Sequence, residues 1–179
     1  MSEDVLLARR RYLAQLLEAL QRCVYYLDSS MVRLPWPISG DTLRVRKKDA
    51  LLFETLAAVN ERFAKLQDTL GAAMKHSALL LAEPNESFLK VLSVFERLGV
   101  IDNPEDWHRC RAVRNLAAHD YDTDYEAIAS HFNDVYDLYP SLLRSATKLI
   151  DLCNERLHVF PTGTDFADEF VRVAQTLRD

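Results

Sequence analysis

Apolar side chains recur at alternating steps of four and three residues along most of this chain, and this spacing limits the fold more than any other feature. The longest series lies between residues 49 and 82, and its members are Leu52, Leu56, Val59, Phe63, Leu66, Leu70 and Ala73. Steps of four and three place side chains on one face of an α-helix, where they pack against other helices. Similar series occupy residues 2–27 and about 125–153. We therefore predict three long helices packed on one another.

Two shorter helices are predicted between the second and third long ones. The first spans residues 86–98 and ends at Gly99, because glycine readily takes the conformation that terminates a helix. The second begins at Pro104, which suits the first turn of a helix, and continues to about His119. Its apolar face is predicted to contain Trp107, Cys110, Val113 and Ala117.

The last long helix is predicted to open with a capping box, in which Thr123 and Glu126 satisfy each other's backbone amides. Pro140 is expected to kink this helix. Its apolar series leaves two alternatives open, because the same residues suit either a dimer interface or the core of one chain.

The predicted fold class is therefore all-α, an up-and-down bundle with four to five main helices. Only 4 glycines and 6 prolines argue against a β-rich fold with many tight turns. We assign residues 1–157 to the bundle, with an irregular basic insert at about 29–48 that contains Pro35 and Pro37. The bland interpretation of this insert is a loop whose Trp36 packs over the bundle. Residues 158–179 form a C-terminal tail with a short amphipathic helix at 165–177.

Charge and cysteine content limit the function and the compartment. The net charge of −5 means that any nucleic-acid contact needs a local basic patch. Cys23, Cys110 and Cys153 are widely spaced, which predicts reduced, buried thiols. The N-terminus does not have the shape of a signal peptide, and no apolar run reaches the length of about 20 residues that a membrane span needs. We expect a cytoplasmic protein.

Residue types able to do chemistry gather in one stretch, Arg114-Asn115-Leu116-Ala117-Ala118-His119-Asp120-Tyr121. RNA carries its own nucleophile, the ribose 2′-hydroxyl, so its cleavage needs only a proton acceptor and a cation. His119 titrates near neutral pH, and the Arg114 guanidinium matches phosphate geometry. On a helix, Asn115 and His119 share one face. Arg114 is about 140° round from His119, at roughly 100° per residue, so two copies of the chain would bring the groups together more easily than one.

The pattern of Arg114, four residues, His119, one residue and Tyr121 resembles the signature of the HEPN superfamily, and within it the HepT-like RNase toxins. The run from Ser87 to Ile101, a short helix before a Gly-Val-Ile turn, resembles the same family and extends the likeness to about residues 49–155.

The resemblance implies a HEPN-type bundle that forms a homodimer with the motif at the interface. It implies a metal-independent endoribonuclease toxin without cofactors, in which Arg114, His119 and Asn115 are catalytic. It also implies a partner, a MntA-type minimal nucleotidyltransferase antitoxin that silences the toxin by adding AMP to Tyr121.

Other interpretations stay open beside this one. The chain could be a non-catalytic nucleotide- or substrate-binding subunit of a minimal nucleotidyltransferase, or a purely structural helical dimer. The motif could also be a hydrogen-bonded helix end. Arg109 and Arg111 are expected to add positive potential beside Arg114 and to contact RNA. The sequence has no Gly-rich phosphate loop and no HExxH motif, and the acidic residues at 120–126 are interpreted as caps and solvated turn; no metal site is predicted.

Overall fold

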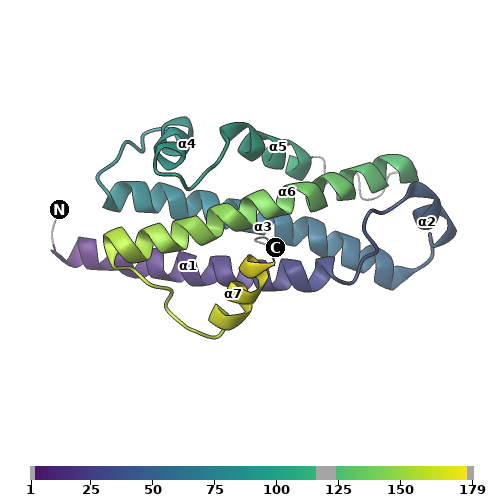
Figure 1. Cartoon of the computed structure of the whole chain (residues 1–179), viewed down its shortest axis with the longest axis horizontal. Helices are drawn as coiled ribbons and strands as arrows, with labels where there is room; N and C mark the ends of the chain where they lie inside the picture. Colours follow the sequence, from purple (N-terminus) through teal and green to yellow (C-terminus); the bar gives the residue numbers. More distant parts are fainter. Residues whose placement is uncertain (1–2, 116–123, 177–179) are drawn as a thin grey trace.

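Three long helices form the body of the molecule, as the apolar spacing predicts (Figure 1). A computed structural model describes residues 3–115 and 124–176, with the backbone alone for Asn115. The long helices are α1 (Glu3–Met31), α3 (Ala50–Leu80) and α6 (Tyr125–Leu152). The described residues are helical with connecting turns, so the all-α fold class is confirmed for them. None of the helices described is long and apolar enough to cross a membrane.

The predicted apolar series are the core of the bundle. Every member of the series in α3, from Leu52 to Ala73, is buried, and so is every member in α6, from Ile128 to Leu149. Burial of the α6 series inside one chain decides between the two alternatives: these side chains belong to the core and are not available to a partner copy.

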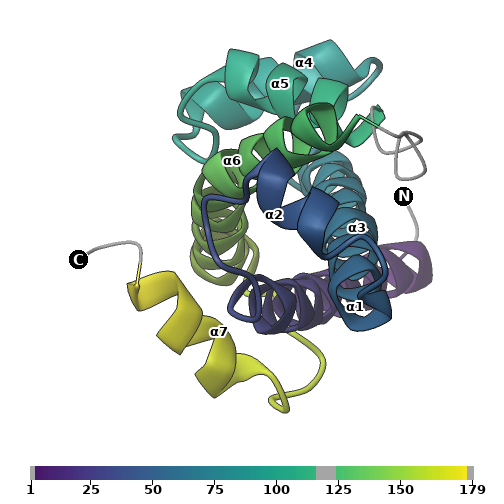
Figure 2. The ribbon, with the colours of Figure 1, turned by 90° about the vertical axis from the view of Figure 1, so that its right-hand side faces the viewer.

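Two short helices, α4 (Phe88–Arg97) and α5 (Pro104–Asn115), lie together outside the long ones and cover α3 and α6 (Figure 2). They carry the chain back along the bundle, so that α6 runs in the same direction as α3, and α1 runs opposite to both (Figure 1). At the end of α4, Gly99 has φ of +73°, the left-handed conformation expected of a helix-ending glycine.

The insert between α1 and α3 is more ordered than the sequence predicts. It contains a short helix, α2 (Gly40–Val45), with Ser39 as its N-cap. Helix α2 packs on α6. Trp36 stacks on Tyr136 of α6 with ring centroids 4.6 Å apart, so the expected packing of Trp36 over the bundle is confirmed. The sequence does not predict α2, because Pro35 and Pro37 precede it and the residues Ser39-Gly40-Asp41 are typical of turns.

The cap of α6 differs from the predicted one. Asp124, rather than Thr123, is the N-cap, and its Oδ1 accepts hydrogen bonds from the backbone amides of Glu126 and Ala127 at 3.1 and 3.2 Å. Aspartate caps at least as well as threonine, so the helix begins at the second of two adjacent candidates. Thr123 itself lies outside the described residues. Helix α6 continues through Pro140.

The C-terminal tail is docked on the bundle. A π-helical turn (Cys153–Leu157) follows α6, and α7 (Ala167–Gln175) then packs against α1 and α6. The predicted amphipathic helix is confirmed, with Phe170 and Val173 buried. Arg10 of α1 donates a 2.5 Å hydrogen bond to the Leu157 carbonyl. This arginine therefore satisfies the end of the π-helical turn.

Candidate functional site

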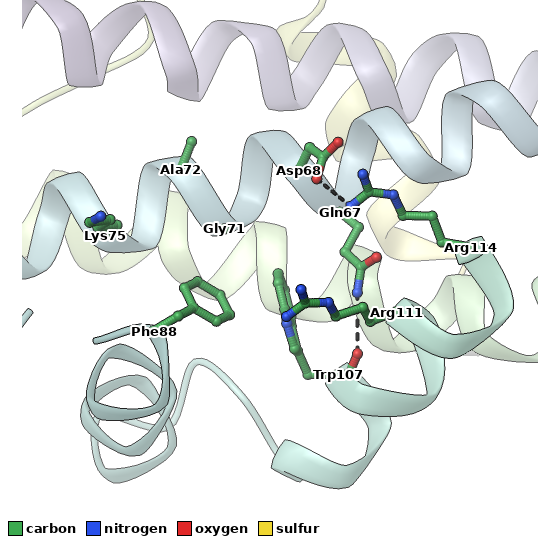
Figure 3. A pocket seen from close by; sticks show the side chains of 9 residues that line it. All are labelled: Gln67, Asp68, Gly71, Ala72, Lys75, Phe88, Trp107, Arg111 and Arg114. Atoms are coloured by element: carbon green, nitrogen blue, oxygen red, sulfur yellow. Dashed lines mark hydrogen bonds and ion pairs between the residues drawn. The ribbon is translucent and has the colours of Figure 1, made fainter. Parts of the chain in front are cut away.

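Helix α5 carries the first part of the motif, and its buried face determines where the motif arginine lies. Trp107, Cys110 and Val113 are buried, as predicted, and fix α5 against α3 and α6. Arg111 and Arg114 come one residue after the buried positions 110 and 113. Both side chains extend from α5 toward α3 (Figure 3).

A pocket of about 300 Å³ lies between α3, α4 and α5 (Figure 3). Its polar wall contains three cationic side chains and one carboxylate, which are Lys75, Arg111, Arg114 and Asp68. Its apolar wall contains the rings of Phe88 and Trp107. The formal charge of this wall is positive in a chain whose net charge is −5, so the pocket supplies the local basic patch that nucleic-acid binding would need.

Asp68 neutralises one of the three cations. Its Oδ1 accepts a hydrogen bond from Arg114 Nη1 at 2.5 Å, and the Arg114 side chain is 34% exposed. Lys75 and Arg111 are exposed, and neither forms an ion pair with a carboxylate of the described residues. Among the residues that the structure describes, these two positive charges therefore have no carboxylate ion-pair partner at the pocket.

The aromatic wall lies over Gly71 of α3, and a buried amide holds it there. The Phe88 and Trp107 rings lie 5.4 Å apart between centroids, tilted by 42°. A Cβ at Gly71 would lie 3.4 Å from Trp107 and 3.5 Å from Phe88, which are ordinary contact distances, so both rings lie close to the α3 backbone at Gly71. Gln67 Nε2 donates a 3.2 Å hydrogen bond to the Trp107 carbonyl, which fastens α5 to α3.

The structure describes only part of the predicted site. Arg114 and Asn115 end α5, and the Asn115 side chain, His119 and Tyr121 lie outside what is described. Arg111 lines the pocket beside Arg114. Arg109 does not line it, and forms a 3.4 Å ion pair with Asp106 on the exposed surface.

Several residues of the pocket are not predictable from sequence patterns. Lys75 and Asp68 stand seven residues apart on α3, outside its apolar series, and look like ordinary surface positions. Trp107 was expected only as a core residue. The packing of α5 on α3 decides which solvent-facing side chains of the two helices meet, and apolar spacing does not report this.

Other groups of interest have structural explanations. In the basic insert, Arg44 pairs with Asp41 and lies 3.8 Å from Glu126, and Arg46 pairs with Asp49 at 2.6 Å. These arginines are therefore compensated by nearby carboxylates. Within residues 3–115 and 124–176, His, Cys, Asp and Glu side chains do not form a group of three that could hold a metal ion.

The three cysteines are free thiols, as expected. Burial raises the pKa of Cys110 to about 12 and that of Cys153 to about 11. Burial also raises the pKa of Cys23, which is only partly buried. The thiolate is the reactive form of cysteine, so these side chains are poor nucleophiles near neutral pH.

Comparison of the chain with known protein families, with curated proteins and with solved structures finds no match in any of the three. The motif and the pocket that Arg114 lines are therefore the features that bear on function.

Proposed function

We propose that this protein is a metal-independent endoribonuclease of the HEPN type, acting as a HepT-like toxin. One observation supports this best: Arg114, the arginine of the motif, lies at the edge of a cationic pocket with an aromatic wall. Positive charge combined with aromatic surface is the composition that single-stranded RNA sites use. Because the chain as a whole is acidic, its overall composition does not account for this local group of cations.

The proposed reaction uses the RNA's own hydroxyl. The ribose 2′-oxygen loses its proton and forms a bond to the adjacent phosphorus, while the bond from phosphorus to the 5′-oxygen breaks. The leaving 5′-oxygen takes up a proton, giving a 2′,3′-cyclic phosphate and a 5′-hydroxyl end. His119 acts as general base or acid, Arg114 stabilises the charge on the phosphorane, and Asn115 orients one or both.

The active form in this proposal is a homodimer. A continuous helix through the motif would separate Arg114 and His119 by about 140°, at roughly 100° per residue, so facing copies of the motif would assemble the site more readily than one copy. Arg114 is partly exposed near the end of α5, so its side chain retains surface that a second chain can contact.

Regulation in this proposal comes from a MntA-type minimal nucleotidyltransferase. That partner transfers AMP to the hydroxyl of Tyr121, two residues after His119. The added phosphate is negative and would compete with RNA for Arg114, which is a charge-based mode of silencing.

A second function is favoured by the size of the pocket. A volume of about 300 Å³ is at the lower end of the range for small-ligand sites and suits one nucleotide better than a strand. The alternative is therefore a non-catalytic nucleotide- or substrate-binding subunit that partners a minimal nucleotidyltransferase, with Arg114 binding a phosphate.

Expression in cells separates the two functions. The toxin proposal predicts growth arrest with RNA decay for the parent chain, and neither for His119→Ala. A binding subunit predicts the same growth with both chains. Arg172→Ala on α7 removes an exposed arginine away from the motif and serves as the matched control.

A further inference from the structure

We infer that the pocket between α3, α4 and α5 is a nucleotide subsite, which binds one nucleoside phosphate of the RNA next to the scissile linkage. The base lies against Phe88 and Trp107, and the phosphate lies between Lys75 and Arg111. This inference rests on the proposed function, because it takes RNA as the substrate; it adds the residues that bind a neighbouring nucleotide.

The phosphate would be bound by Lys75 and Arg111. Lys75 extends from α3 and Arg111 from α5, so the two charges face the pocket from different helices (Figure 3). Neither has a carboxylate partner among the described residues, in contrast to Arg44 and Arg46 in the basic insert. Two cations on different helices of one pocket attract an anion of phosphate size.

The base would be bound by the aromatic wall. Phe88 and Trp107 present ring surface on the side of the pocket away from the Asp68–Arg114 ion pair (Figure 3). Every nucleobase has a π face that contacts such rings, so this wall provides affinity with little sequence preference. Inorganic phosphate alone would use the cations and leave the rings uncovered.

Asp68 gives the subsite a counter-charge that links it to the motif. Its carboxylate engages Arg114 at 2.5 Å and lies in the same wall as Arg111. The negative charge of Asp68 repels a phosphate bound in the same pocket, so Asp68 lowers the affinity for the nucleotide. Removing its charge is therefore expected to act in the opposite direction to removing a cation.

Calorimetric titration of the whole protein with adenosine 3′-monophosphate tests the inference. Lys75→Ala and Arg111→Ala should each weaken binding about tenfold, the scale of one lost charge-assisted contact. Asp68→Asn should tighten binding several-fold, about three- to tenfold. Lys90→Ala on α4 removes an exposed lysine outside the pocket and should leave binding unchanged.

Two further probes separate the roles of base and phosphate. Adenosine and inorganic phosphate should each bind more weakly than the nucleotide. In a Trp36→Phe background, where Trp107 is the remaining tryptophan, the emission should change with adenosine 3′-monophosphate and not with phosphate. Equal response to phosphate alone would mean that an anion binds without the base and would overturn the subsite.

Failure of this inference is distinguishable from failure of the proposed function. If RNA is cleaved with unchanged KM by Lys75→Ala and Arg111→Ala, and the nucleotide does not bind, the subsite is wrong while the RNase proposal stands. If the nucleotide binds as predicted but RNA is not cleaved, the subsite stands and the binding-subunit function is favoured. A raised KM with unchanged kcat in Lys75→Ala would support both.

Discussion

At the scale of single residues, His76 gives the protein a defined pH sensitivity. Burial lowers the pKa of this imidazole; a hydrogen bond to the Arg9 carbonyl at 3.0 Å opposes that effect, and the nearby Arg9 charge adds to it. The unfolded chain therefore takes up the proton more readily than the folded chain. Stability contributed by neutral His76 is present above the ordinary histidine pKa of about 6.5 and is lost as the pH falls through the lowered folded pKa.

His76→Gln should flatten that dependence. Urea unfolding of parent and variant at intervals from pH 7.5 to 4.5 measures it, and the difference between the two curves isolates this residue from the other histidines. The stabilities should converge as the pH falls. Parallel curves would show that His76 does not titrate differently in the folded and unfolded states.

Substitution of a single residue, Tyr121, tests the proposed regulation separately from catalysis. We expect Tyr121→Phe to keep its fold and to escape silencing by a cognate nucleotidyltransferase, because the hydroxyl that would accept AMP is gone. Mass spectrometry of co-expressed protein should find the added AMP on Tyr121. Its appearance on Tyr125 instead, or normal silencing of the variant, would make the assignment wrong.

At the scale of elements, one amide fastens the insert to the bundle. The Asn133 side chain accepts a 2.8 Å hydrogen bond from the Ile38 amide and donates a 2.9 Å hydrogen bond to the Ile38 carbonyl. Asn133→Ala should lower the free energy of unfolding by about 1–3 kcal/mol, because both bonds are part-buried. Urea unfolding measures this, with exposed Asp134→Ala as control; equal losses in the two variants would contradict a specific role for the amide.

The helices differ in how well the sequence predicts them. Leu52, Phe63 and Leu70 repeat with helical spacing because burial requires it, so the long helices and their inward faces were predictable. Helix α2 was not, because its stability comes from the Ser39 cap and from packing on α6 rather than from its own periodicity. The pairing of Asp68 with Arg114 joins residues 46 positions apart and depends on helix placement that no local pattern encodes.

At the scale of the whole molecule, the composite site predicts a dimer. Sedimentation or small-angle scattering should give twice the mass of one 20.6 kDa chain. The interface must use surface outside the core series of α6, since those side chains are buried within one chain. An RNase-active monomer would remove the argument that two motifs are needed.

The proposed ribonuclease activity of the motif is best tested by incubating the purified protein with single-stranded RNA and measuring cleavage. His119→Ala and Arg114→Ala should each slow cleavage about 30- to 1,000-fold, roughly 2–4 kcal/mol of transition-state stabilisation, while circular dichroism stays helical. Arg172→Ala should cleave like the parent, and EDTA should have no effect. Cleavage by His119→Ala at the parent's rate would contradict the claim.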